Sequence, residues 1–349
     1  MESRSVLRRA MDVVGWIATP LVPSHYVELF DPLRATHVRH ARVVAVLRET
    51  ERARTIVLRP GAGWREHRAG QFVTVSVEVD GRFLTRAYSI TSSPDRSDGL
   101  FTITVTAMGR VSNALVHRTR PGDYVRIGLP EGEFTLPDDR PARLLFVTGG
   151  SGITPVRGML RTLALRKAMP DVVHLHYARS EADVIFGAEL RHLAREQASY
   201  RFEPRVANAP VFSRATLDEV APDFRSRAAF ACGPESLLDA VAAVVPDVRV
   251  ERFRPRFASP AADARGGRVR FARSKRELDA GGATPLLEVA ERAGMSPPHG
   301  CRIGICHSCD ATMRAGAVRD LRTGKILDEP GARFQPCVCA AAGDVEIDL

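Results

Sequence analysis

The chain has 349 residues, of which 44% are hydrophobic and 26% are charged, values that suit a folded protein of about two or three domains. Six cysteines are too few for a disulfide framework in a chain of this size, and five of them lie between residues 301 and 339, which favours a metal site in a reducing compartment. The net charge of +9 comes from arginines scattered among acidic residues and not interleaved with aromatic residues, which argues against nucleic-acid binding.

Residues 1–37 form an N-terminal extension. Its apolar run VVGWIATPLV is preceded by Asp12, is far shorter than the roughly 20 residues that span a bilayer, and is followed by no signal-peptide cleavage site. We therefore expect a cytoplasmic protein. A helix that packs on the next domain is one interpretation of this extension. A surface for a membrane, which would place the protein at the inner face of that membrane, is the other.

Residues 38–140 read as short strands rich in β-branched residues and separated by Gly or Pro, such as HARVVAVLRE, TIVLRP and FTITVTAM. This pattern predicts a small antiparallel β-barrel or sandwich. Two motifs stand out within it. RAYSITSSP carries Arg86, Tyr88 and Ser89, and MGRVSNAL opens a helix with Gly109, Val111 and Ser112. A guanidinium suits phosphate, an aromatic ring can stack, and a helix N-terminus can hold an anion.

Residues 141–254 alternate strands with helices, which predicts a parallel sheet. The first strand runs into Gly149, Gly150 and Gly152, and Thr154-Pro155 then supplies an expected N-cap and first-turn proline. Such glycines let a pyrophosphate approach the backbone, although this turn is not the G-x-G-x-x-G of the dinucleotide fingerprint. Later segments of interest are HYARS after the second strand, and ACGPESL and VERF near the end.

Residues 255–267 are rich in Pro, Ala, Arg and Gly without apolar periodicity, and we interpret them as a linker. The following segment, 268–349, contains Cys301, Cys306 and Cys309 in a C-x4-C-x2-C array, followed by Cys337 and Cys339. This spacing is typical of a plant-type [2Fe–2S] cluster, whereas structural zinc sites more often use C-x2-C pairs at both ends. Glycines at 300 and 304 would let the loop wrap closely around a cluster.

A [2Fe–2S] cluster carries one electron at a time, so a hydride donor needs an intermediary such as flavin. Taken together, these motifs resemble those of the ferredoxin-reductase-like flavoproteins with a plant-type ferredoxin domain fused at the C-terminus. The resemblance implies a multi-domain α+β protein. An antiparallel flavin-binding barrel would occupy 38–140, an α/β parallel-sheet nicotinamide-binding domain 141–254, and a β-grasp ferredoxin domain 268–349.

The resemblance also implies roles for the residues of the barrel. Arg86 would face the flavin phosphate, Tyr88 would lie against the isoalloxazine, and Ser89 would reach the reactive edge near N5. The loop that contains Gly109, Val111 and Ser112 would hold the pyrophosphate. FAD is the usual cofactor in this family, and FMN occurs in some relatives with a fused ferredoxin. Phe253 of VERF would shield the ring, with an ordinary core aromatic as the alternative.

In the second domain, the resemblance implies that NADPH or NADH is bound by Gly149, Gly150, Gly152 and Thr154. Arg179 and Ser180 are candidates for a 2′-phosphate, which favours NADPH, although NADH-dependent relatives also carry arginine there. The turn of Cys232, Gly233 and Pro234 would lie by the nicotinamide, so that Cys232 and Ser89 are the two residues expected at the hydride-transfer site. A buried, chemically inert thiol is the alternative for Cys232.

For the cluster, CVCAAAGDVEIDL matches the family with Cys337 as the fourth ligand and Cys339 where serine is common. The expected activity is NAD(P)H-dependent electron transfer through flavin and cluster to a terminal monooxygenase, hydroxylase or membrane fatty-acid desaturase. The extension resembles those of actinobacterial-type reductases that serve membrane desaturases or alkane hydroxylases. The alternatives are the reductase of a soluble ring-hydroxylating dioxygenase, and a flavin and iron–sulfur redox sensor without turnover.

Overall fold

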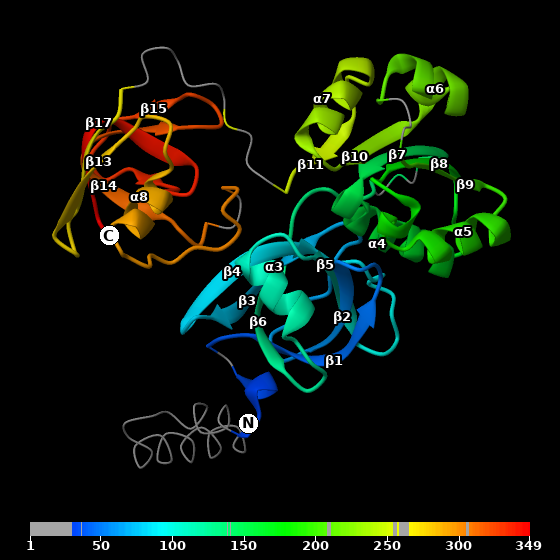
Figure 1. Cartoon of the computed structure of the whole chain (residues 1–349), viewed down its shortest axis with the longest axis horizontal. Helices are drawn as coiled ribbons and strands as arrows, with labels where there is room; N and C mark the ends of the chain where they lie inside the picture. The colour runs from blue at the N-terminus through cyan, green and yellow to red at the C-terminus, as the bar shows by residue number, and fades with distance from the viewer. Residues whose placement is uncertain are drawn as a thin grey trace, which may run out of the picture. The chain divides into compact units, whose positions relative to one another are not determined.

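The structure is a computed structural model that describes residues 30–35, 37–137, 139, 141–207, 211–253, 257, 265–304 and 307–349. The chain divides into two compact units, one that extends to Val250 without residues 84–87, and one that comprises Leu84–Ala87 and Glu251–Leu349 (Figure 1). Most of the N-terminal extension lies outside the described residues, and so does the interpretation that it contacts a membrane or packs as a helix. Among the residues that are described, no helix is long and apolar enough to cross a membrane.

The first unit begins with a six-stranded antiparallel sheet in the order β4-β3-β6-β1-β2-β5. Its strands are β1 (His40–Arg48), β2 (Ala53–Pro60), β3 (Phe72–Val79), β4 (Arg82–Ser89), β5 (Phe101–Thr106) and β6 (Tyr124–Glu131), preceded by the short 3-10 helix η1 (Pro32–Arg34). Residues 84–87, which are grouped with the second unit, belong to β4. Ile90, directly after β4, forms an antiparallel bridge to Ile103 of β5. The two edge strands therefore meet, and the sheet curls into the expected barrel around buried β-branched residues. Helix α3 (Arg110–His117) lies between β5 and β6 in the chain.

The same unit continues with a five-stranded sheet in the order β11-β10-β7-β8-β9. Its strands are β7 (Arg143–Gly149), β8 (Asp171–Tyr177), β9 (Tyr200–Arg205), β10 (Ala228–Cys232) and β11 (Arg249–Glu251). The central pairs, β10 with β7, β7 with β8 and β8 with β9, are parallel. Parallel strands are buried on both faces, which explains the continuous apolar runs LLFV and VVHLHY.

Helices cover both faces of this parallel sheet (Figure 1). One core lies on the side of α4 (Ile153–Leu165) and α5 (Gly187–Glu196), and the other on the side of α6 (Arg214–Val220) and α7 (Glu235–Val244). Short 3-10 helices, η2 (Gly150–Gly152), η3 (Glu181–Asp183) and η4 (Phe224–Ser226), complete the connections. The first core also includes Ala53, Ala69 and Phe134 of the barrel region, so barrel and parallel sheet share apolar contacts.

The second unit holds a mixed sheet in the order β13-β12-β17-β14-β15, with β16 paired to β14. Its elements are β12 (Gly267–Phe271), β13 (Arg276–Ala280), α8 (Leu286–Arg292), β14 (Ala311–Asp320), β15 (Ile326–Leu327), β16 (Arg333–Phe334) and β17 (Cys339–Ile347). The pair of β12 and β17 is parallel and the other pairs are antiparallel. Leu286, Leu287 and Val289 of α8 pack on this sheet, as expected for a β-grasp domain.

Candidate functional site

The structure brings together three cysteines of the last domain. Cys301, Cys309 and Cys337 are all buried. The Cys337 side chain forms a hydrogen bond with Cys309, and this bond, burial and the nearby Cys301 raise the pKa of the Cys337 thiol far above its usual value. Cys306 lies outside the described residues. Neighbouring buried thiols whose negative charges would repel one another are the donor set that a thiolate-ligated iron–sulfur cluster neutralises, so the residues present fit such a group.

Within the described residues, no three His, Cys, Asp or Glu side chains converge on one point as ligands of a single ion do. Cys339 is buried as well, and burial raises the pKa of its thiol to about 12. It bonds to the backbone of Gln335 and lies near Asp320 and Arg322. The two thiols that follow the array therefore have different hydrogen-bond partners: the Cys337 thiol bonds to Cys309, whereas the Cys339 thiol bonds to the backbone of Gln335.

Gly304, which follows Cys301 in the array, has a backbone conformation that favours glycine. Gly304 has φ +76°, and a Cβ added there would lie 2.9 Å from Cγ2 of Val338 and 2.5 Å from Nη1 of Arg322. Arg322 Nη1 donates a hydrogen bond of 2.8 Å to the Gly304 carbonyl oxygen. The positive φ favours glycine here, as the sequence pattern predicts for this position, and a larger residue would also have to displace the side chains of Val338 and Arg322.

In the barrel, the residues of R-x-Y-S lie at the end of edge strand β4. Arg86 and Tyr88 are half-buried, and Ser89 is buried. Arg86 donates to the carbonyl oxygen of Thr85 at 2.7 Å. An ion pair between Arg110, the first residue of α3, and Asp80, in the turn before β4, links this strand's hairpin to the helix. The two barrel motifs are therefore held on connected elements.

The N-terminus of α3 fits a phosphate group. Gly109 is its N-cap and has no side chain to cap the helix, and a Cβ added there would meet nothing within 4 Å. The Ser112 hydroxyl accepts hydrogen bonds from the backbone N–H groups of Met108 and Gly109 at 3.0 and 2.8 Å, which shapes the turn. Val111 is buried beneath it. An uncapped helix N-terminus beside open space is a favourable position for an anion.

In the glycine turn after β7, the glycines have different roles. A Cβ at Gly152 would lie 2.0 Å from the carbonyl oxygen of Cys232, and one at Gly149 would lie 2.8 Å from Cδ of Pro234. Gly233 likewise lies against Gly149, with 2.9 Å between an added Cβ and the Gly149 nitrogen. These three glycines let the β7 turn contact the end of β10. Gly150 differs, because it has φ +53° and faces open space.

The expectation that Thr154 is the N-cap of the following helix is wrong. The 3-10 turn Gly150–Gly152 runs directly into α4, so Gly152 is the N-cap and Thr154 lies inside the first turn. The Thr154 hydroxyl donates to the carbonyl oxygen of Ser151 at 2.8 Å. Pro155 is tolerated because the first N–H groups of a helix have no intrahelical acceptor.

Arg179 and Ser180 follow β8, and both contact Asp183. The Arg179 guanidinium lies 3.3 Å from one carboxylate oxygen and the Ser180 hydroxyl donates to the other at 2.9 Å. The Arg179 side chain is 73% exposed. This arrangement holds a cation and a hydroxyl at the carboxyl end of the sheet, where nucleotides bind in open α/β folds.

At the same end of the sheet, Cys232 is fully buried and pairs in register with Thr148. Gly233 and Pro234 form the turn after it. Phe253, in contrast, is 43% exposed. Two residues before it, burial raises the pKa of Glu251 to about 7. The structure thus places Cys232 beside the glycine turn, while Phe253 is not buried in any core.

A buried polar network in the parallel sheet was not predicted from the sequence. The Thr148 hydroxyl lies 2.8 Å from both His174 Nε2 and His176 Nδ1, and His174 Nδ1 lies 3.0 Å from the Tyr200 hydroxyl. Burial lowers the pKa of His174 well below its usual value and that of His176 to about 3. The signal was the alternation HLH within an apolar strand, which places both rings on one face.

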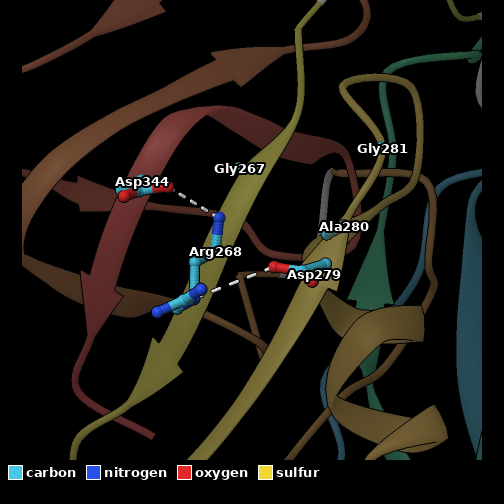
Figure 2. Close-up of a pocket in the computed structure, with 6 residues that line it drawn as sticks. All are labelled: Gly267, Arg268, Asp279, Ala280, Gly281 and Asp344. Atoms are coloured by element: carbon cyan, nitrogen blue, oxygen red, sulfur yellow. Dashed lines mark hydrogen bonds and ion pairs between the residues drawn. The ribbon is translucent and has the colours of Figure 1, made fainter.

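One surface pocket lies on β12 and β13 and at Asp344 of β17. It is lined by Gly267, Arg268, Asp279, Ala280, Gly281 and Asp344. As Figure 2 shows, Arg268 is held from both sides, since its backbone N–H donates to Asp344 at 2.8 Å and its guanidinium lies 3.9 Å from Asp279. The charged residues that line this pocket thus interact with one another, and we assign the pocket no ligand.

An anion site on a β-barrel, a glycine turn at the end of a parallel sheet, and a thiol array on a β-grasp domain define an oxidoreductase that uses flavin, nicotinamide and an iron–sulfur cluster. Family models agree in that order. The oxidoreductase FAD-binding domain matches residues 63–136, the oxidoreductase NAD-binding domain residues 146–243, and the 2Fe-2S iron-sulfur cluster binding domain residues 269–342.

Two proteins named as oxidoreductase or reductase are similar to the chain in sequence. The chain is 44% identical to an "NADPH oxidoreductase" of Mycobacterium tuberculosis, over 97% of this chain and 91% of that protein. It is 30% identical to a "glycine betaine monooxygenase reductase subunit" of Pseudomonas aeruginosa, over 80% and 86%. The solved structure of phthalate dioxygenase reductase has the same fold, with a TM-score of 0.62 at 23% identity over 89% of this chain and 97% of that one. The chain belongs to the ferredoxin-reductase-like flavoproteins with a C-terminal [2Fe–2S] domain, whose cofactors are FAD, the cluster and NAD(P)H.

Proposed function

We propose that this chain takes a hydride from NADPH and delivers electrons one at a time, through its [2Fe–2S] domain, to a terminal monooxygenase. One observation supports this proposal above all: a single chain combines an FAD-binding barrel, an NAD-binding sheet and a domain with buried thiols. The two relatives support its details, because one is named an NADPH oxidoreductase and the other a monooxygenase reductase subunit.

The barrel residues hold the flavin. Bound FAD supplies the conversion of a two-electron hydride into single electrons, which the cluster then carries. The guanidinium of Arg86 and the N–H groups of Val111 and Ser112 bind its phosphates, and Gly109, whose own N–H donates to the Ser112 hydroxyl, leaves room for them. Tyr88 supplies an aromatic face, and the buried Ser89 hydroxyl offers a hydrogen bond in a site with little competing water.

The parallel sheet holds the nicotinamide nucleotide. Gly150, which faces open space, and the first turn of α4 with Thr154 receive the pyrophosphate. The side chains of Arg179 and Ser180, which bond to Asp183 in this structure, bind the 2′-phosphate of NADPH instead. The turn of Cys232, Gly233 and Pro234 borders the nicotinamide, and Phe253 shields the flavin ring. Cys232 acts by its small size, since its full burial suits packing better than thiol chemistry.

The cluster is held by Cys301, Cys306, Cys309 and Cys337. Cys337 is the fourth ligand in this proposal because its thiol contacts Cys309 and lies near Cys301. Cys339 supports the site from the adjacent strand position. The thiolates bind iron, and the Gly304 loop folds its backbone close to them.

An anaerobic titration tests the proposal. NADPH and NADH are added separately to the purified chain while the flavin and [2Fe–2S] absorbance bands are recorded. We expect both bands to bleach, at lower concentration with NADPH. Continuous turnover with cytochrome c as artificial acceptor separates the reductase from a redox sensor, which would be reduced once without turnover. Bands that respond to neither nucleotide would contradict the proposal.

The acceptor needs its own comparison. The reduced chain is mixed with a soluble monooxygenase component and, separately, with a membrane desaturase in vesicles, and product formation is measured. If product forms with the desaturase and not with the monooxygenase, the desaturase is the acceptor and this part of the proposal is wrong. Flotation of the full chain with anionic vesicles tests whether residues 1–37 contact a membrane, and absence of the chain from the vesicle fraction would remove that interpretation.

A further inference from the structure

A buried arginine connects the barrel to the parallel sheet. Arg157 lies on α4, and its side chain is only 10% exposed. Its Nη1 donates a hydrogen bond of 3.0 Å to the carbonyl oxygen of Thr91, which belongs to the barrel. Its Nε and Nη2 bind the two carboxylate oxygens of Glu189 on α5, at 3.1 and 2.9 Å. The guanidinium also stacks on Phe186, with Cζ 4.3 Å from the ring centroid.

Each donor edge of this guanidinium has a specific acceptor, which is what a buried charge requires. Burial alone would raise the pKa of Glu189, but hydrogen bonds and charges from Arg157 and Arg161 lower it below its usual value. The ion pair therefore exists at neutral pH. A planar, paired guanidinium has few alternative orientations, so the Thr91 carbonyl is held at a defined distance from α4 and α5.

The segment that Arg157 holds leads directly from the flavin motif. Thr91 lies two residues after Ser89, and Ile90 between them is locked in the barrel by its bridge to Ile103 and by its N–H bond to the Gln71 carbonyl. Thr91 itself bonds to Thr102 across the barrel. Because this connection is short, extended and paired, a displacement of Thr91 is passed on to Ser89.

The other end of the connection is the nucleotide-binding turn. Arg157 lies four residues, or about one helical turn and 6 Å, after the first residue of α4. Further along, Thr162 of α4 donates to Ser93 at 3.0 Å, and Arg166, the C-cap of α4, binds Asp95 at 2.7 Å. Of these three contacts, the one between Arg157 and Thr91 has its two residues nearest in the chain to the Gly150–Gly152 turn and to Ser89, respectively.

We propose that Arg157 is a positioning residue for hydride transfer, which holds the Ser89–Thr91 segment of the barrel at a fixed spacing from the first turn of α4. The inference rests on the proposed function, because that spacing matters only if flavin and nicotinamide react there. Reactions between two bound groups are sensitive to small displacements, since a misplacement of about 1 Å can lower a rate by about a hundredfold.

The test compares Arg157→Met with the matched control Arg161→Met in the FAD-loaded full chain. Arg161 also binds Glu189, at 2.8 Å, but its side chain is 51% exposed. Four quantities are measured: FAD content, the Kd for NADP+, the rate constant of flavin reduction at saturating NADPH, and the amplitude of the long-wavelength charge-transfer absorbance between nicotinamide and flavin.

For Arg157→Met we expect a fall in the rate constant of about tenfold or more and a weaker charge-transfer band, with the Kd for NADP+ within about threefold of wild type. Arg161→Met should keep both quantities. A wild-type rate and band in Arg157→Met, or equal losses in both variants, would overturn the inference. A loss that merely follows FAD content would also overturn it, because that result indicates a structural role alone.

If Arg157→Met does not fold, Arg157→Lys provides the test. Lysine keeps the charge but cannot bind Glu189 through two nitrogens and reach Thr91 at once, so the rate and the band should still fall. Wild-type behaviour of Arg157→Lys would overturn the inference. If the wild-type flavin is bleached by neither NADPH nor NADH, the proposed function fails and this inference with it. Bleaching of the wild type with an unchanged Arg157→Met rate overturns the inference alone.

Discussion

The carbonyl oxygen of Gly304 accepts a hydrogen bond of 2.8 Å from Nη1 of Arg322. Gly304 lies in the loop between the first two cysteines of the array, and Arg322 is anchored through its Nε and Nη2 to the carboxylate of Asp320 at 3.1 and 2.7 Å. Asp320 is the last residue of β14. Arg322 therefore connects the cysteine loop to the sheet, and places a positive charge near Cys337 and Cys339.

Replacing Arg322 by Met should weaken the cluster site. The loop loses its link to β14, and the thiolates lose a nearby positive charge, so we expect less iron per chain and a lower midpoint potential of the remaining cluster. Iron and sulfide analysis and an EPR-monitored redox titration measure both quantities. Arg314→Met, which removes an arginine that binds Asp348 in the same unit, is the control. Wild-type iron content and potential in Arg322→Met would contradict this prediction.

The two thiols after the array should respond differently to substitution. Cys337→Ser removes the thiol that contacts Cys309, so we expect loss of the [2Fe–2S] absorbance. Cys339→Ser replaces a thiol that contacts Gln335 and the Asp320 region, and the variant should retain the cluster. Absorbance spectra and iron content of both proteins after anaerobic reconstitution provide the measurement. The reverse result would identify Cys339 as the ligand.

Two glycines of the β7 turn should separate folding from nucleotide binding. Gly152→Ala places a Cβ 2.0 Å from the Cys232 carbonyl oxygen, so we expect destabilisation by about 3 kcal/mol. Gly150→Ala faces open space with φ +53°, where alanine costs about 1–2 kcal/mol, and its methyl group would obstruct the pyrophosphate. We therefore expect Gly150→Ala to fold and to raise the KM for NADPH.

Urea denaturation and steady-state kinetics of these two variants provide the comparison. If Gly152→Ala is as stable as Gly150→Ala, the close approach of Gly152 to the end of β10 is not needed for folding. An unchanged KM in Gly150→Ala would place the pyrophosphate elsewhere.

The sequence was most informative where chemistry imposes local spacing. The cysteine array, the R-x-Y-S strand and the glycine turn are each contained in about ten residues, and the structure has strand β4 and the 3-10 helix η2 at the last two. The helix start was misplaced because a 3-10 turn continued into α4. The contacts of Arg157 and the Thr148–His174 network join residues 26 to 66 positions apart. A local pattern such as HLH places two side chains on one face, but it does not identify their distant partners, because the fold determines which side chains meet.

Arg179 should determine preference between nucleotides. Its exposed guanidinium lies against Asp183 at 3.3 Å, and a 2′-phosphate offers it a stronger, doubly charged acceptor. We expect Arg179→Gln to raise the KM for NADPH by about tenfold, a loss of about 1.4 kcal/mol, while the KM for NADH stays within about twofold. NADH acts as the control within the same protein. Equal changes for both nucleotides would place the 2′-phosphate away from Arg179.

Stability of the first unit should fall in mild acid because of its buried histidines. The pKa of His176 is about 3 in the folded chain but about 6.5 when unfolded. Below pH 6.5 the unfolded chain therefore binds a proton that the folded chain does not, so this contribution is complete above that pH and decreases as pH falls towards 3. At pH 5 the loss is about 2 kcal/mol for this histidine. His174, whose pKa burial lowers in the same direction, adds to it.

His176→Gln should reduce this pH dependence, because an amide retains a hydrogen-bond partner for Thr148 but does not titrate. Urea denaturation of the FAD-loaded chain between pH 7.5 and 5, followed by flavin fluorescence, should show a shallower fall in the free energy of unfolding for His176→Gln than for wild type. His192→Gln, which replaces an exposed histidine of α5, is the control and should keep the wild-type slope. Parallel pH profiles for wild type and His176→Gln would show that His176 is protonated in the folded protein, which would require a partner for its Nε2 beyond those found among the described residues.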